Sequence, residues 1–308
     1  MWLHERLLTQ PFLAILLFHR VNDSIPEDGL TVSTWRFRQI CQLLRERFRV
    51  ISLAEVFRIV REKAAMPRRT VAITFDDVSR VKTTEPRESW MPRRTVAITF
   101  DDCYADNWEA AHILHQYQLP ATFFLPTGFV GTRRRFEWDR GLPELPNLTW
   151  QQVREMAALG HDIGSHTVNH VNMGEVNLAV AWYELTASRG MIEDQVGRAC
   201  RFFAYPFGGP QHFRSEYLPL LEQAGYEGGL SAFGGFVRPG CDDRLLPREA
   251  VPYFKSLSHL ELHLSGCLNW WYAWRGRERS QTEVPQGFED QPSEMSSLSR
   301  RGFVPHIG

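Results

Sequence analysis

The sequence predicts an α/β fold in which helices cover a parallel β-sheet that is closed or nearly closed into a barrel. Short runs of apolar, β-branched and aromatic residues alternate along the chain with longer segments of helical periodicity. That alternation is typical of parallel strands joined by crossover helices. The chain has 308 residues, of which 43% are hydrophobic, so it can bury the core of one large domain.

Seven segments have the composition expected of buried strands. They are Phe12–Phe18, Thr95–Phe100, Ala121–Leu125, His161–Gly164, Arg201–Tyr205, Tyr226–Ser231 and Leu246–Val251. Helical periodicity is found in Thr34–Phe48, Leu53–Lys63, Asp106–Tyr117, Trp150–Leu159, Val176–Val196 and Phe213–Ala224. The helix that begins at Trp150 has clear ends, because Thr149 and Gln152 form a capping box and Gly160 provides the stop.

A final amphipathic helix is expected from Leu257 onward, where apolar residues recur at helical spacing. Trp270 and Trp274 lie one turn apart beside that stripe, and they either pack against the barrel or stack on a sugar. After residue 274 the chain is rich in Gln, Ser, Glu, Pro and Gly, which predicts a disordered tail. The expected domain therefore covers residues 1–274, and the tail covers 275–308.

One segment of twelve residues, MPRRTVAITFDD, occurs twice, as Met66–Asp77 and again as Met91–Asp102. Two copies do not make a solenoid, which needs about three units, so residues 78–102 are interpreted as a duplicated insert. A helical segment follows the second copy, whereas a polar spacer follows the first. The second copy is therefore expected in the sheet, and the identical first copy, ending in Asp76 and Asp77, is the alternative.

The composition excludes several classes of protein. A formal net charge of −1 disfavours a nucleic-acid partner. The five cysteines are scattered and lack C-x-x-C spacing, which argues against a disulfide framework or a structural zinc site. Pro11–Phe18 is interpreted as a buried first strand rather than a signal-peptide core, and no apolar run reaches the roughly 20 residues of a membrane span. A cytoplasmic protein without a membrane span is expected.

Acidic and imidazole side chains follow two of the predicted strands. Asp101 and Asp102 end the strand Thr95–Phe100, and α/β barrels build their sites at such carboxyl ends. His166 and His170, four residues apart, follow another strand and can chelate one ion. Two imidazoles and one carboxylate leave coordination positions open for water and substrate, as a catalytic metal requires.

Each motif also has a structural alternative. Strand-ending aspartates commonly start loops or cap helices. A second histidine pair with the same spacing, His259 and His263, falls inside the predicted final helix and is assigned to structure or surface. Residues 205–209 form a Pro/Gly-rich turn that either presents backbone N–H groups to a ligand or is an ordinary turn. Arg248 pairs either with an active-site carboxylate or with a surface acid.

Taken together, these motifs resemble the polysaccharide deacetylases of carbohydrate esterase family 4. The resemblance runs in order from LLFHR at residues 16–20 to about Trp274, and its specific parts are TFDD, HTVNH and FAYPFG. It implies a distorted (β/α)7 barrel. It also implies a metal-dependent hydrolase that removes N-acetyl groups from an amino-sugar polysaccharide or oligosaccharide, and a setting in exopolysaccharide metabolism.

The resemblance assigns roles to individual residues. Asp101 is implied to be the general base, and the backbone N–H of Phe207 stabilises the oxyanion. The implied ligands of one divalent metal ion, usually zinc, are Asp102, His166 and His170. The implied substrate-binding residues are Tyr205, Pro206 and Gly208.

The sequence departs from the family pattern in three places. Ala204 replaces the usual Arg before the Pro-aromatic-Gly turn, and we hypothesise that Arg248 replaces that guanidinium in space and keeps Asp101 ionised. Phe207 replaces the usual Tyr. The late Leu-x-His, which supplies the general acid, has only His263 as a candidate. Two alternatives therefore stay open: a catalytically impaired sugar-binding barrel, and an amidase that acts on a non-sugar amide.

Overall fold

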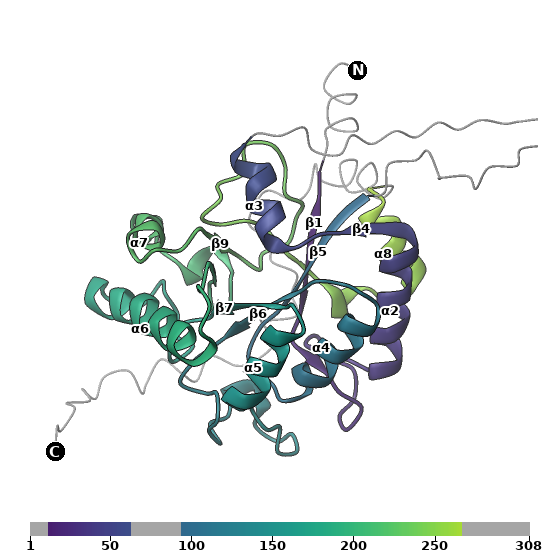
Figure 1. The fold of residues 1–308 in the computed structure, drawn as a ribbon, viewed down its shortest axis with the longest axis horizontal. Helices are drawn as coiled ribbons and strands as arrows, with labels where there is room; N and C mark the ends of the chain where they lie inside the picture. The colour runs from purple at the N-terminus through teal and green to yellow at the C-terminus, as the bar shows by residue number, and fades with distance from the viewer. Residues whose placement is uncertain (1–11, 63–93, 267–308) are drawn as a thin grey trace, which may run out of the picture.

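The computed structural model describes residues 12–62 and 94–266. An eight-stranded parallel sheet lies at the centre, and helices surround it (Figure 1). Its strands are β1 (Ala14–Phe18), β4 (Phe48–Val50), β5 (Arg94–Phe100), β6 (Thr122–Leu125), β7 (Asp162–Ser165), β8 (Phe202–Ala204), β9 (Gly228–Leu230) and β10 (Glu249–Ala250). The strand order is β10-β1-β5-β6-β7-β8-β9, and β4 pairs with β5 beside this path. The predicted α/β class is confirmed.

All seven predicted strands are present. The short strand β4 and a separate two-stranded sheet, formed by β2 (Arg20–Val21) and β3 (Thr31–Val32), are additional to them. The two ends of the main sheet approach each other, because Leu246 forms a parallel bridge with Leu230 of β9 shortly before β10 pairs with β1. The sheet is therefore curled into the form of a distorted barrel.

Seven α-helices lie in the described residues. They are α2 (Thr34–Arg47), α3 (Leu53–Arg61), α4 (Asp106–Gln116), α5 (Trp150–Ala158), α6 (Leu178–Val196), α7 (Leu218–Gln223) and α8 (Leu257–Leu264). The predicted capping box of Thr149 and Gln152 starts α5, and Gly160 follows its end with φ +96°. The helix predicted over Phe213–Ala224 is shorter than expected, since Ser215–Tyr217 form a 3-10 turn before α7.

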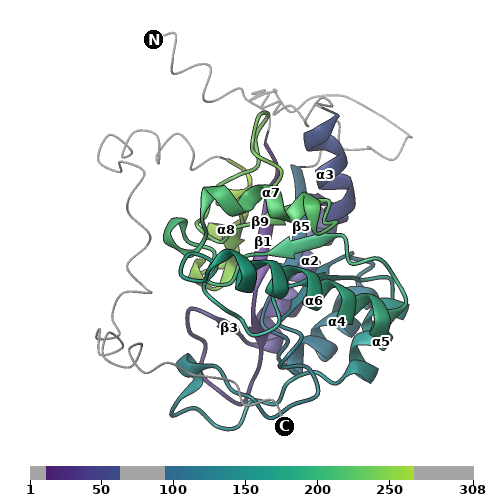
Figure 2. The ribbon, with the colours of Figure 1, turned by 90° about the vertical axis from the view of Figure 1, so that its left-hand side faces the viewer.

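Alternation along the strands separates two apolar cores, because successive side chains point to opposite faces of a sheet. On the outer face, the ring of Phe100 stacks between Phe18 and Phe123, with ring centroids 5.1 and 4.7 Å away. The inner face includes Phe202, whose ring stacks on Phe57 of α3 at 4.8 Å. Figure 2 shows α3 at one end of the sheet and β3 at the other. Thus α3 closes the end of the barrel opposite the carboxyl ends of the strands.

The second copy of the repeated segment provides β5, the strand between β1 and β6. The first copy and its spacer lie outside the described residues, as do Trp270, Trp274 and the predicted tail. None of the described helices is long and apolar enough to span a membrane. The described cysteines are free: Cys41, Cys103, Cys200 and Cys241.

Candidate metal centre

Three potential metal ligands converge at the carboxyl ends of β5 and β7. One ligand atom from each of Asp102, His166 and His170 lies within 4.8 Å of the others, and all three residues are buried. The Oδ1 atom of Asp102 lies 3.2 Å from Nε2 of His170 and 3.5 Å from Nε2 of His166. The structure therefore brings together the two histidines and the aspartate that the motifs single out.

The donor atoms of this group fit a metal ion better than they fit one another. Oδ1 of Asp102 is buried and has no hydrogen-bond partner, although two imidazole nitrogens lie close to it. Nδ1 of His166 lies 2.8 Å from the carbonyl oxygen of Ala204. Because a carbonyl oxygen can only accept, Nδ1 is the donor in this contact, and in the neutral ring Nε2 is then the ligand atom that faces the group. Two imidazoles and one carboxylate form a donor set suited to a divalent cation.

The charges in this group shift the pKa values of its members. Burial would raise the pKa of Asp102, but the neighbouring His166 and His170 hold it well below its usual range. Burial also lowers the pKa of His170, while Asp101 and Asp102 outweigh burial and raise that of His166. The carboxylate is thus ionised, which is the form that binds a cation.

Strained backbone is concentrated at the same place. Six non-glycine residues in the described ranges have a positive φ, and five of them belong to the strand-end loops of this site. These five are Asp102, Cys103, Thr167, His170 and Phe207. Left-handed backbone of this kind costs about 1–3 kcal/mol per residue and persists where the surroundings impose it. The surroundings of the site therefore hold these loops in fixed conformations.

A buried glutamate of α6 holds the loop that carries His166 and His170. Oε2 of Glu184 in α6 accepts the backbone N–H groups of Val168 and Asn169 at 2.7 and 2.9 Å. Its Oε1 accepts the side-chain amide of Asn169 at 2.8 Å. Glu184 thereby fixes the turn between His166 and His170, and the sequence pattern alone does not distinguish it from a surface residue of α6.

Arg248 forms a bidentate ion pair with Asp101. Its Nη1 and Nη2 atoms lie 2.7 Å from the two carboxylate oxygens, and its Nε donates to the carbonyl of Ser231 at 2.7 Å. Both side chains of the pair are buried. Burial would raise the pKa of Asp101, but the charge of Arg248 outweighs it, so the pKa lies below its ordinary value. The ion pair hypothesised between Arg248 and Asp101 is present.

His19, at the end of β1, is a further member of the site that the motifs do not single out. The backbone N–H of Asp101 donates to the carbonyl of Phe18, so His19 and Asp101 are the first residues beyond two paired strands. Nδ1 of His19 is buried without a hydrogen-bond partner. Burial lowers the pKa of His19, while the charges of Asp102 and Asp101 act to raise it. The position after an apolar strand was the signal that could have identified this histidine.

The turn after β8 directs one aromatic ring to the site. Phe207 is 40% exposed, and its ring centroid lies 4.8 Å from that of His170. Tyr205, Pro206 and Gly208 are buried. The ring of Tyr205 packs on Phe203 in the core, and a Cβ atom on Gly208 would clash with the backbone nitrogen of Ala232. Of the predicted turn residues, Phe207 is thus the one whose side chain faces outward.

His263 serves the packing of α8. Its ring packs against Phe236 and Phe254, with centroid distances of 4.9 and 4.8 Å, and its Nε2 lies 3.3 Å from Glu249. The position of His19 relative to Asp101 makes His19 the better candidate for an acid–base role.

The polysaccharide deacetylase family model matches residues 88–229, which include β5, the metal ligands and the turn after β8. The chain contains a polysaccharide deacetylase domain. This match includes the second copy of the repeated segment and excludes the first. Among individual relatives, Bacillus subtilis (strain 168) YxkH is 27% identical over 142 residues, which cover 46% of this chain and 44% of YxkH. The match to this relative therefore spans less than half of its length.

Longer matches agree with the deacetylase domain. The poly-β-1,6-N-acetyl-D-glucosamine N-deacetylase of Staphylococcus aureus (strain MSSA476) is 27% identical over 227 residues, 71% of this chain and 67% of that protein. The structure of Streptococcus pyogenes deacetylase PplD in complex with acetate has a TM-score of 0.64 at 24% identity, covering 83% of this chain and 99% of that one. The structure of IcaB from Ammonifex degensii has a TM-score of 0.60 at 20% identity, and the match covers 83% of this chain and 96% of IcaB. These structures have the same fold.

Replacing Arg248 should disable the site and destabilise the fold. Arg248→Ala leaves the buried carboxylate of Asp101 without its partner, so the free energy of unfolding should fall by about 3–5 kcal/mol. Chemical denaturation measures this loss, and acetate release should fall sharply. Arg244→Ala, which removes an exposed partner of Asp242, is the matched control and should change stability by less than about 1 kcal/mol. An equal effect of the two substitutions would contradict the role assigned to the Arg248 pair.

Replacing Glu184 should weaken metal binding without removing a ligand. Glu184→Gln turns one acceptor oxygen into a donor that faces backbone N–H groups, which loosens the turn between the two histidines. We expect metal affinity to fall about 10–100-fold, as for other residues that orient ligands. Titration of the protein against a chromogenic chelator measures this affinity. Asp194→Asn, at an exposed position of the same helix, should leave it unchanged; an unchanged affinity in Glu184→Gln would refute this role.

Proposed function

We propose that this chain is a metal-dependent hydrolase that removes N-acetyl groups from an amino-sugar polysaccharide or oligosaccharide. The observation that carries the proposal is the buried set of Asp102, His166 and His170 beside a carboxylate, Asp101, that Arg248 keeps ionised. The family match supports this reaction class. The similarity to a poly-β-1,6-N-acetyl-D-glucosamine N-deacetylase supports a polymer of N-acetylglucosamine as substrate.

Asp102, His166 and His170 would hold the cation, and we propose that it is zinc. Two imidazoles and one carboxylate are a common set of ligands in catalytic zinc sites, which keep a further position open. When bound, the cation would act as a Lewis acid: it would polarise the acetamide carbonyl and lower the pKa of water.

The residues of the chain divide the proton transfers between them. Asp101 accepts a proton from the attacking water, whose oxygen adds to the acetamide carbonyl carbon. Arg248 keeps Asp101 ionised and oriented, since it binds both carboxylate oxygens. The backbone N–H of Phe207 donates to the oxygen on which negative charge develops. Acetate and the free amine are released when the C–N bond breaks.

His19 is proposed to protonate the departing amine. An amine is a poor leaving group until it gains a proton, so a donor beside the base is needed. His19 fits this task because it lies at the end of β1, next to Asp101 across the sheet. Burial lowers the pKa of His19, and the charges of Asp102 and Asp101 act against burial, toward the protonated form that this role requires.

Removing the general base should strongly reduce acetate release. Comparing the same substitution in the two copies of the repeated segment shows which copy forms the active site. Asp101→Asn should lower the rate at least about 100-fold with zinc present, because general-base catalysis is lost. Asp76→Asn, the identical substitution in the first copy, should leave the rate unchanged. Acetate released from N-acetylglucosamine oligomers is measured, together with metal content. Loss only in Asp76→Asn would reverse the assignment, and bound zinc without acetate release in the wild type would indicate a sugar-binding barrel without activity.

Replacing His19 should affect substrates according to their leaving group. His19→Ala should slow deacetylation of an N-acetylglucosamine oligomer by about 100-fold or more, because the amine must be protonated. Hydrolysis of 4-nitrophenyl acetate should change little, since nitrophenolate leaves without a proton. His263→Ala serves as the comparison. A general acid affects only the oligomer, whereas a packing residue affects both substrates alike. Equal losses on both substrates would contradict the proposed role of His19.

A further inference from the structure

A stack of four side chains ends beside the metal centre. In the loop between β6 and α5, the guanidinium of Arg134 lies 4.2 Å from the ring centroid of Phe129. Phe129 stacks on Phe136 at 4.4 Å, and Phe136 stacks on Trp138 at 4.6 Å with an interplanar angle of 13°. Phe129 and Phe136 are buried, whereas Trp138 is 37% exposed. Phe136 covers one face of Trp138, so this stack leaves the opposite face of the indole open to a further layer.

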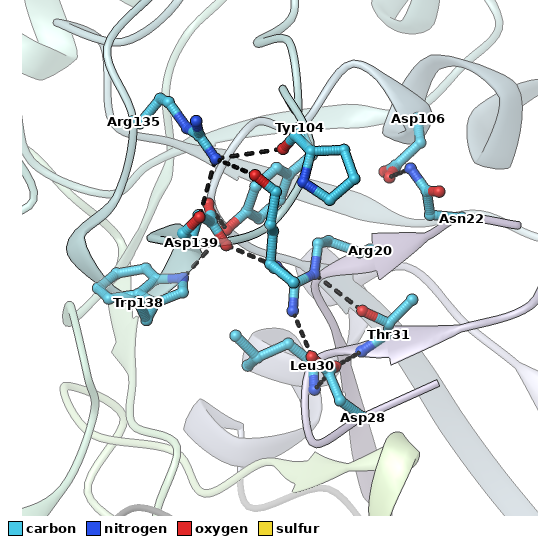
Figure 3. Close-up of polar contacts among 12 residues, drawn as sticks. Arg20, Asn22, Asp28, Leu30, Thr31, Tyr104, Asp106, Arg135, Trp138 and Asp139 are labelled. Atoms are coloured by element: carbon cyan, nitrogen blue, oxygen red, sulfur yellow. Dashed lines mark hydrogen bonds and ion pairs between the residues drawn. The ribbon is translucent and has the colours of Figure 1, made fainter. Parts of the chain in front are cut away.

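A buried polar chain fixes the plane of this indole (Figure 3). Nε1 of Trp138 donates to the hydroxyl of Tyr104 at 3.1 Å, and that hydroxyl donates to Asp139 at 2.9 Å. The other oxygen of Asp139 accepts a hydrogen bond from Arg20 at 2.6 Å. Tyr104, Asp139 and Arg20 are all buried. Figure 3 shows the indole nitrogen facing this cluster and the rest of the ring extending away from it.

The loop that carries the stack is also anchored along its backbone. Arg135 donates to the carbonyl oxygens of Asp139, Leu142 and Pro143 at 2.8–3.1 Å. The side-chain amide of Asn147 donates to the carbonyl oxygens of Thr132 and Arg134. Such a loop loses little conformational freedom when a ligand binds, so it presents a preformed surface.

Trp138 lies next to the residues that would contact the reacting group. Its ring centroid is 5.2 Å from that of the metal ligand His170 and 5.9 Å from that of Phe207. Phe207 is itself exposed beside His170. The outer face of the indole therefore forms a wall at the edge of the metal centre, within reach of a group attached to the acetamide.

The ligand that matches this wall is a sugar ring. A pyranose of gluco configuration carries its substituents equatorially and exposes axial C–H groups on its faces. These C–H groups carry a small positive charge and are attracted to the negative face of an aromatic ring. Their burial also removes apolar surface from water. We propose that Trp138 stacks on a gluco-configured pyranose of the substrate and forms the next layer of the stack. This rests on the proposed function, and it favours a carbohydrate over a simple amide.

The test compares a sugar substrate with a probe that has no sugar. In Trp138→Ala, the KM and the Kd for an N-acetylglucosamine tetramer should rise about tenfold, which corresponds to about 1.4 kcal/mol. Hydrolysis of 4-nitrophenyl acetate should stay within about twofold of wild type, because the metal centre is intact. Trp138→Phe keeps an aromatic face and should retain most of the affinity. Trp182→Ala, a tryptophan of similar exposure (40%) on α6, is the matched control and should match wild type.

Calorimetry on the zinc-loaded and zinc-free proteins provides a readout that is independent of turnover. An unchanged tetramer Kd in Trp138→Ala would overturn the proposal, as would an equal loss on both substrates, which would mean that Trp138 only supports the metal centre. A wild-type protein that binds no tetramer would also overturn it. If the wild type releases no acetate but binds the tetramer through Trp138, the proposed reaction fails and the sugar subsite stands.

Discussion

The interior of the barrel depends on the buried ion pair between Arg248 and Asp101. The guanidinium joins three parts of the curled sheet, since it contacts Asp101 and Thr99 of the β5 segment and the carbonyl of Ser231 after β9, while its own backbone leads into β10. The edges of the sheet meet there through the single bridge of Leu230 and Leu246. Arg248 therefore links segments on both sides of this meeting point and also fixes the carboxylate beside the metal ligands.

Arg248 explains how the chain can lack the arginine of the family pattern and still place a positive charge beside Asp101. The resemblance places an arginine where this chain has Ala204, and Ala204 contributes only its carbonyl oxygen, which binds His166. Thr99 and Asp101 are two residues apart and share one face of the strand. The long side chain of Arg248, just before β10, reaches that face across the interior. The chemical requirement is a fixed cation against Asp101, and strands on different sides of a curled sheet can supply it across the interior.

Sequence patterns predicted those parts of the molecule that short-range regularities control. Strand composition identified β1 and β5 to β10, and residue spacing identified the two histidines, because a catalytic motif is local in sequence. Glu184 carries no such signal, since its role arises from contacts with residues at least 15 positions away. His19 follows an apolar strand, but only the folded sheet places it beside Asp101. Arg134 and Arg135 are exposed loop residues, and the sequence does not show that they hold the aromatic stack and its backbone. Only the folded chain brings their partners within reach.

Two buried arginines thus fix side chains on two sides of the metal centre. Arg248 fixes the carboxylate next to the metal ligands, and Arg20 fixes Asp139 and, through Tyr104, the indole of Trp138. Replacing a buried ion pair by apolar residues of similar size often preserves or increases stability. Stability alone is therefore a weak reason for these pairs to exist. Each pair positions a group beside the metal centre. The Arg248 pair positions the carboxylate of Asp101, and the Arg20 pair positions the indole of Trp138. We infer that their common role is to hold reactive and binding groups at fixed positions, while strained loops between them carry the metal ligands.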